Sequence, residues 1–159
     1  MINIKLIALG NLKEGYLRDA FSEYAKRLGG LCHFELVELK EYKLKDSPSD
    51  SEIDAALADE AKRILALLPP RAYKIALCVE GKQLSSERFA EKIEKASQTH
   101  GEIIFVIGSS HGLSESVKTA CDARLSISEM TFPHQLMRVI MAEAIYRAMN
   151  ILKGTKYHK

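Results

Sequence analysis

The sequence predicts an α/β fold, a three-layer α/β/α sandwich around a mostly parallel sheet. Two observations lead to this prediction. Apolar runs of strand length alternate with segments of helical periodicity along the whole chain. The run at 103–108 (IIFVIG) is apolar at every position except its final glycine, which is typical of a strand buried on both faces. A chain of 159 residues with no repeats is expected to form one domain, residues 1–159.

The alternating segments can be placed in order. Strands are expected at 2–9, 32–39, 73–79, 102–108 and 124–128. Helices are expected at 16–28, 52–68, 86–98, 115–121 and from about 133 to 152. Ser51, Ser85 and Ser114 each precede acidic residues in a first helical turn and are the expected N-caps. Only 40–50 (KEYKLKDSPSD) is expected to be a long polar loop.

Composition argues against several classes of protein. The three cysteines, Cys32, Cys78 and Cys121, are widely spaced and odd in number, so neither a disulfide framework nor a zinc motif is expected. The five histidines form no i,i+4 pair, and no metal site is expected. No apolar run approaches the roughly 18 residues of a membrane span, and no signal pattern is present. A cytoplasmic protein without a membrane partner is therefore expected.

The charge is unevenly distributed. Residues 138–159 contain five basic residues and one acidic residue, although the net charge of the whole chain is only +2. A basic end indicates a polyanionic partner such as nucleic acid, and a solvated helix end is the simpler alternative. The low overall charge argues against tight binding to free RNA.

In an open α/β sheet, ligands bind beyond the carboxyl ends of the strands. Three segments lie at such ends here: 80–82, which equally fits a simple turn, 108–112 (GSSHG) and 125–135 (LSISEMTFPHQ). Neither a phosphate-binding P-loop nor a dinucleotide-binding glycine motif is present. A ligand of nucleotide type must therefore be bound in another way.

The segment 108–112 also matches the G-x-S-x-G pattern of serine hydrolases, with Ser110 as nucleophile. Triad partners in the required chain order are Asp122 or Glu129, followed by His134 or His158. The pattern requires a helix directly behind the serine, whereas the expected N-cap, Ser114, comes four residues later. A glycine loop that lets a ligand approach the backbone is the favoured interpretation.

The last helix has an apolar arc of about 200°, roughly twice the width that one packing partner requires. The excess predicts a second partner, and a homodimer packed through this helix is the hypothesis. Arg138 lies inside the arc, in the first turn, where a cation needs an anionic partner. That partner is a carboxylate, from Glu129 or from across an interface, or else a phosphate or ligand carboxylate. His134 fits a structural role at the helix start.

The chain ends in TKYHK. Tyr157 can stack or donate a hydrogen bond, His158 can move a proton near neutral pH, and Lys159 can contact phosphate. Together with FVIG at 105–108 and LSISEMTFPHQLMRV at 125–139, the terminal YHK gives the whole chain a specific resemblance. It resembles the ribosomal RNA large subunit methyltransferase H family of the SPOUT superfamily. One departure is Ser109, which stands where the family commonly has a second glycine.

The resemblance implies S-adenosylmethionine as methyl donor and N3 of a pseudouridine as acceptor, in the helix 69 loop of 23S rRNA on the assembled ribosome. It also implies a homodimer and a C-terminal trefoil knot. The cofactor contacts that it implies are Leu77, Gly108, Ile127, Ser128, Glu129, Met130, Thr131 and Phe132.

The acceptor N3–H must lose a proton during methyl transfer, and His158 is the candidate base. Arg138 is assigned to an RNA phosphate or to the carboxylate of the donor, and Tyr157 and Lys159 to the RNA. A noncatalytic RNA-binding or ribosome-associated module with the same basic tail is the alternative, and it is distinguished by having no affinity for S-adenosylmethionine.

Overall fold

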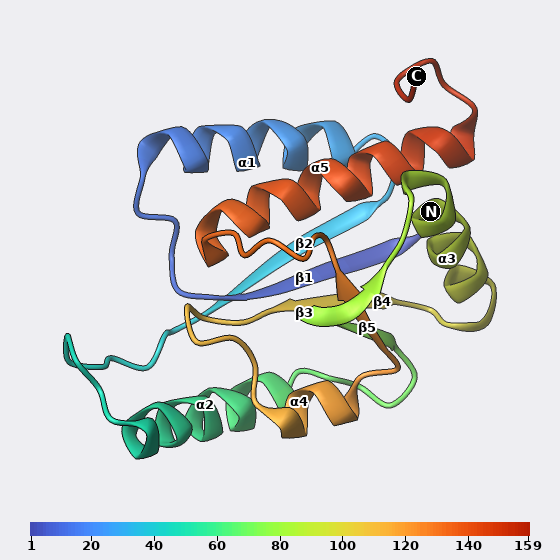
Figure 1. The fold of residues 1–159 in the computed structure, drawn as a ribbon. Helices are drawn as coiled ribbons and strands as arrows, with labels where there is room; N and C mark the ends of the chain where they lie inside the picture. The colour runs from blue at the N-terminus through green and yellow to red at the C-terminus, as the bar shows by residue number, and fades with distance from the viewer.

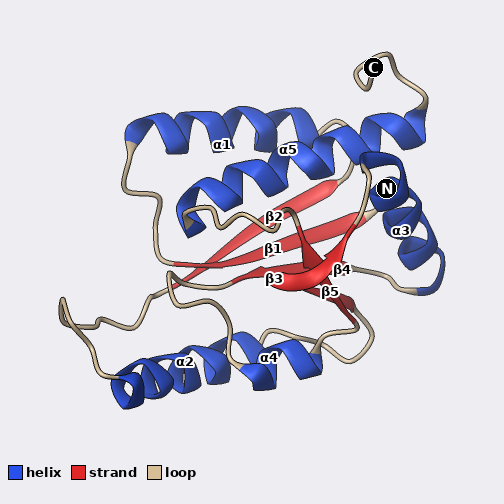
Figure 2. Cartoon of the chain, in the orientation of Figure 1, coloured by secondary structure: helices blue, strands red, loops and turns tan.

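A computed structural model describes residues 1–159 and contains one five-stranded sheet in the order β2-β1-β4-β3-β5 (Figures 1 and 2). All four strand pairings are parallel, and Leu6 in β1 lies between Leu36 in β2 and Phe105 in β4. The α/β prediction is confirmed. The strands are β1 (Asn3–Leu9), β2 (His33–Leu39), β3 (Tyr73–Gln83), β4 (Ile103–Ile107) and β5 (Ala123–Ser126).

Helices cover both faces of the sheet, as Figure 1 shows. They are α1 (Gly15–Leu28), α2 (Asp50–Leu65), α3 (Ser86–Thr99), α4 (Glu115–Ala120) and α5 (His134–Lys153). One apolar cluster joins α1, α3 and α5 to one face, and a second joins α2 and α4 to the other. Every residue of β4 is buried, as expected for a strand with helices on both sides. None of the helices combines the length and the apolarity needed to cross a membrane.

Helix boundaries follow the capping side chains. Ser85 and Ser114 accept hydrogen bonds from the backbone N–H groups of residues 88 and 117, which confirms both as N-caps. The cap of α2 is Ser49, and the prediction of Ser51 was wrong. Ser49 lies three residues before Glu52, so that the two residues can form a reciprocal capping box. The helix therefore begins earlier than expected and ends at Leu65.

β3 extends beyond its expected end. Its pairing with β5 shifts register, because both Leu77 and Lys82 lie opposite Leu125. Between them, a Cβ atom on Gly81 would lie only 2.6 Å from the carbonyl carbon of Leu125. The backbones of β3 and β5 are thus in direct contact at Gly81, where no larger residue fits without movement of the backbone.

Candidate active site

Three segments meet at the carboxyl edge of the sheet and enclose a cavity of 690 Å³. They are the end of β3, the glycine loop between β4 and α4, and the loop between β5 and α5. Seven of the eight residues predicted to contact a cofactor line this cavity, and Glu129, which is exposed, does not. Those seven are Leu77, Gly108, Ile127, Ser128, Met130, Thr131 and Phe132.

The glycine loop is a tight turn. A Cβ atom on Gly108 would lie 2.3 Å from the carbonyl oxygen of Gly112, and Gly112 has a φ of +82°. The N–H of Gly112 donates to the carbonyl oxygen of Ser109 at 2.9 Å. Ser109 is buried in this turn, so the turn forms with serine in the position where the resembling family has glycine. The absence of a side chain at Gly108, which is buried, lets the backbone of Gly112 pack directly against it at the cavity wall.

Side-chain hydrogen bonds from two serines fold the loop between β5 and α5. The hydroxyl of Ser126 donates to the carbonyl oxygen of Ser128 at 2.9 Å, and the N–H of Met130 donates to the hydroxyl of Ser128 at 3.0 Å. Such local bonds hold a chain that has no regular secondary structure. Met130 remains 71% exposed, and Phe132 is half-buried at the cavity wall.

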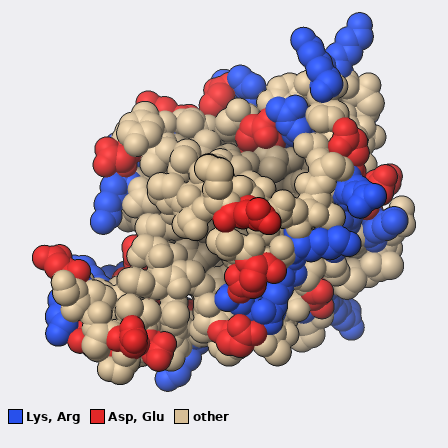
Figure 3. Space-filling model, viewed as in Figure 1, with Lys and Arg blue, Asp and Glu red and all other residues tan.

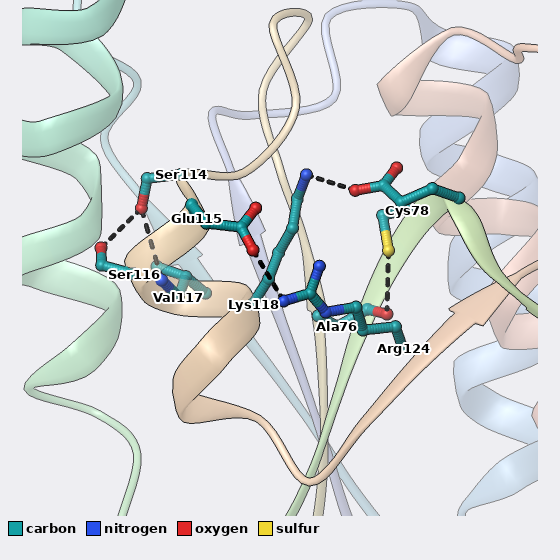
Figure 4. Close-up of polar contacts among 9 residues, drawn as sticks. Ala76, Cys78, Ser114, Glu115, Ser116, Val117, Lys118 and Arg124 are labelled. Atoms are coloured by element: carbon teal, nitrogen blue, oxygen red, sulfur yellow. Dashed lines mark hydrogen bonds and ion pairs between the residues drawn. The ribbon is translucent and has the colours of Figure 1, made fainter.

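An ion pair lies in the wall of the cavity. The ammonium of Lys118 on α4 donates to the carboxylate of Glu80 at 2.5 Å, and this bond lowers the pKa of Glu80 (Figure 4). Arg124 points from β5 to Glu115 nearby, at 2.8 Å. Burial raises the pKa of the neighbouring Cys78 thiol, which therefore stays protonated. The cavity thus has one positive and one negative group side by side.

The hydrolase geometry is missing around Ser110. Helix α4 begins only at Glu115, and the expected partner His158 bonds instead to Glu87 and Arg147. The buried Nε2 of His134, the other expected partner, has no hydrogen-bond partner, and burial lowers the pKa of this residue. The structure contains no group of three or more histidine, cysteine or carboxylate side chains that could hold a metal ion.

Comparison with known proteins agrees with this arrangement. A family model described as "Predicted SPOUT methyltransferase" matches residues 2–158. The chain is 47% identical to ribosomal RNA large subunit methyltransferase H of Limosilactobacillus reuteri and 48% identical to that of Streptococcus thermophilus. In both cases 99% of this chain aligns with 100% of the relative. The chain belongs to the ribosomal RNA large subunit methyltransferase H family of SPOUT methyltransferases.

Two solved structures have the same fold at low sequence identity. A probable methyltransferase from Bordetella pertussis has a TM-score of 0.60 at 16% identity, with 93% of this chain and 95% of that chain aligned. A probable methylase family protein from Haemophilus influenzae has a TM-score of 0.56 at 15% identity, with 99% and 71% aligned. At these low identities, the two similarities show that the fold is shared.

The side chain of Arg138 in this SPOUT methyltransferase points from α5 into the protein interior rather than to the surface. Its side chain is 1% exposed and donates to the carboxylate of Glu38 at 2.6 Å, and to the carbonyl oxygens of Leu9 and Gly10 at 3.2 and 2.9 Å. The prediction of a carboxylate partner is therefore confirmed, but the carboxylate is that of Glu38 in the same chain, and the prediction of Glu129 was wrong. Because α5 packs across the sheet, its first turn directs Arg138 toward the ends of β1 and β2. In this position Arg138 offers no surface to an RNA phosphate.

The C-terminal tail of the methyltransferase is ordered against the far end of α5. The hydroxyl of Tyr157 donates to Glu143 at 3.1 Å, and its ring packs edge-on against Tyr146 with centroids 4.7 Å apart. Burial and the bond to Glu143 raise the pKa of Tyr157 to about 12. His158 Nε2 lies 2.8 Å from the carboxylate of Glu87, and Lys159 is exposed.

The tail follows the last turn of α5, whereas the loop between β5 and α5 leads into its first turn, at the other end of the helix (Figure 1). This loop and the first turn line the cavity. A helix of 20 residues is about 30 Å long. Tyr157, His158 and Lys159 lie beyond the last turn of this helix, and none of them lines the cavity of the same chain.

The cavity also contains residues that the sequence did not reveal. Lys118 is the main omission, since the segments 80–82 and 108–112 were already candidate ligand segments at strand ends. The only available signal for Glu80 was its position directly after an apolar strand, and that signal equally fitted a turn. The pairing with Lys118 spans 38 residues and depends on the fold.

Proposed function

We propose that this methyltransferase transfers the methyl group of S-adenosylmethionine to N3 of a pseudouridine in the helix 69 loop of 23S rRNA. The acceptor would be the assembled ribosome in the cytoplasm. The observation that carries the proposal is the convergence of seven predicted cofactor residues on one cavity at the carboxyl edge of the sheet. The relatives that align over their full length are named ribosomal RNA large subunit methyltransferase H.

The residues of the cavity fit S-adenosylmethionine. The cavity volume of 690 Å³ lies within the range of about 300–1,000 Å³ that is typical of small-molecule sites. Leu77, Ile127 and Phe132 offer apolar contacts to an adenine, and the backbone of the glycine loop, which lines the cavity, offers hydrogen bonds to its edge. Glu80 and Lys118 match the opposite charges of the methionyl ammonium and carboxylate. The cofactor supplies a methyl group activated by the adjacent sulfonium.

The protein has to orient the acceptor, exclude water and accept the N3 proton. Positioning alone can contribute several kcal/mol to the rate. The imidazole of His158 is the proposed base, because a neutral ring nitrogen can accept a proton. Tyr157 and Lys159 are proposed to contact the RNA beside it. Arg138 is proposed to act indirectly, by holding the first turn of α5 against β1 and β2.

A homodimer would bring the tail to the cavity. Several apolar side chains of α5 are only partly buried in one chain, and Figure 3 shows an uncharged area over this part of the surface, with charged side chains at its margins. These side chains are Leu136, Met137, Val139, Ile140 and Ala144. We propose that a second copy covers them and that each tail completes the cavity of the partner subunit. A partner is required because the tail of the same chain lies at the far end of α5.

We also propose that the segment after β4 is knotted as a trefoil, as in the resembling family. Membership of the SPOUT methyltransferase family supports this proposal. The loop between β5 and α5 would then be the threaded segment, and its two serine hydrogen bonds would help to hold it in place.

The test is methyl incorporation from labelled S-adenosylmethionine into ribosomes that lack the modification. We expect the wild type to be active and deletion of 157–159 to reduce turnover by roughly 100-fold or more, the range that loss of a general base produces. Calorimetry should show equal S-adenosylmethionine affinity for both proteins. Full activity of the deletion variant would refute the assignment of the tail. No affinity of the wild type for S-adenosylmethionine, alone or with ribosomes, would favour a noncatalytic ribosome-binding module.

A further inference from the structure

A second groove, of 680 Å³, adjoins the proposed cofactor cavity. The two share a wall formed by Ser109, Ser110 and His111 of the glycine loop. The opposite wall is the loop between β2 and α2, which is visible in Figure 1 as the long teal connection at the edge of the molecule. A ligand in this groove would therefore lie next to a methyl donor in the cavity.

The loop between β2 and α2 is fixed to α2 although it has no regular secondary structure. Glu60 of α2 is only 3% exposed, and its carboxylate accepts a hydrogen bond from the N–H of Tyr42 at 3.0 Å. Arg63, one turn further along α2, donates to the carbonyl oxygen of Lys40. A carboxylate is seldom buried unless hydrogen bonds compensate its lost hydration. The buried Glu60 is thus explained by its bond to the loop, which positions Tyr42.

The charges available in the groove are mainly positive. Four lysines line it: Lys13, Lys40, Lys43 and Lys45. Lys45 pairs with Glu52, and the other three have no carboxylate within salt-bridge distance. Of the three lining acids, Glu60 is buried and bonded to the loop. Glu41 is half-buried against Gly10, another residue of the groove, and Asp46 is exposed. The three unpaired lysines thus outnumber the two remaining acids.

Tyr42 lies among these lysines and is 42% exposed. Lysines beside an exposed aromatic ring on an anchored loop match an RNA strand, because phosphates pair with ammonium groups and bases stack on aromatic rings. We propose that this groove binds the RNA strand that carries the target base. Lys13, Lys40 and Lys43 contact its phosphates, and Tyr42 stacks on a base. This inference rests on the proposed function and adds an RNA-contact surface beside the cavity, next to the glycine loop.

The test compares wild type with a triple variant, Lys13→Gln, Lys40→Gln and Lys43→Gln, on ribosomes that lack the modification. We expect the KM for ribosomes to rise at least roughly tenfold, and the dependence of log(kcat/KM) on log[salt] to become shallower by about two to three units. The affinity for S-adenosylmethionine should be unchanged. A second triple variant, Lys26→Gln, Lys62→Gln and Lys95→Gln, removes the same charge from exposed sites outside the groove and should behave like wild type.

Tyr42 is tested in the same assay. Tyr42→Ala should raise the KM for ribosomes by roughly tenfold, the loss expected for one stacked base, whereas Tyr42→Phe should retain the wild-type value. Thermal melting of each variant checks that the fold is intact. Cosedimentation with large ribosomal subunits measures binding independently of methylation.

The outcomes separate the two proposals. If wild type methylates ribosomes and the groove variants match the control variant in KM, salt dependence and cosedimentation, the groove is not an RNA site. If wild type is inactive on ribosomes, the proposed function fails. In that case, cosedimentation alone tests whether the groove binds RNA. Equal binding by wild type and the groove variant would show that it does not.

Discussion

The two ends of α5 differ in the groups that surround them. The first turn lies beside the cavity, which the glycine loop and the loop after β5 line together. The last turn carries side chains, with Tyr157 and His158 packed on Glu143, Tyr146 and Glu87. One chain can therefore assemble the proposed cofactor site by itself, but it cannot bring its own tail to that site. Separate defects at the two ends should therefore have different effects.

The largest effect is expected at the cavity end. Gly108→Ala adds a Cβ atom that would lie 2.3 Å from the carbonyl oxygen of Gly112, so the glycine loop must open. We predict a loss of S-adenosylmethionine affinity of roughly 100-fold, since overpacking a rigid turn costs up to about 3 kcal/mol. Isothermal calorimetry measures this loss directly.

Gly101→Ala is the matched control. A Cβ atom at Gly101 would have no neighbour within 4 Å, so the substitution should leave the affinity unchanged. If Gly108→Ala bound the cofactor as tightly as Gly101→Ala, the cavity would not be the cofactor site, and the contrast between the two ends of α5 would disappear.

A smaller effect is expected where the first turn of α5 is fixed to the sheet. Arg138→Ala removes three hydrogen bonds, including the bond to Glu38, and should lower the free energy of unfolding by about 2–4 kcal/mol. Chemical denaturation measures the change, and Arg138→Lys should recover part of it. An unchanged stability with a higher KM for ribosomes would instead indicate that Arg138 contacts the RNA, as the sequence analysis predicted.

The smallest effect is expected at His134. Burial lowers its pKa, so the unfolded chain binds a proton more readily than the folded protein does. The stability of the wild type should therefore fall as the pH is lowered through the usual histidine pKa of about 6.5. His134→Gln should show a weaker fall between about pH 7 and pH 5, as followed by thermal melting across that interval. An identical pH dependence in both proteins would show that His134 titrates normally in the fold.

The sequence predicted much of the fold because the signals for it are local. Apolar runs placed all five strands, and two of the three predicted serine caps are correct. The extension of β3 was not predictable, because it depends on contact between Gly81 and Leu125, which are 44 positions apart. The partner of Arg138 was missed for the same reason, since Glu38 lies 100 residues away in the sequence.

In the proposed site, too, the local segment was predictable from the sequence and the long-range contacts were not. The contiguous segment, residues 127–132, was found through family resemblance, and all of it except Glu129 lines the cavity. The ion pair of Glu80 with Lys118, and the groove held by Glu60, join segments that are distant in sequence. Charged side chains at the surface have no periodic pattern that would reveal such partners.

Completion of the cavity of one subunit by the tail of the other can be tested with a heterodimer of differently tagged chains, one with Gly108→Ala and one with residues 157–159 deleted. The homodimer of each variant should be nearly inactive on ribosomes. The heterodimer should recover about half of wild-type activity, because in a two-fold dimer one of its two sites combines an intact cavity with an intact tail. A heterodimer no more active than the variant homodimers would contradict the claim.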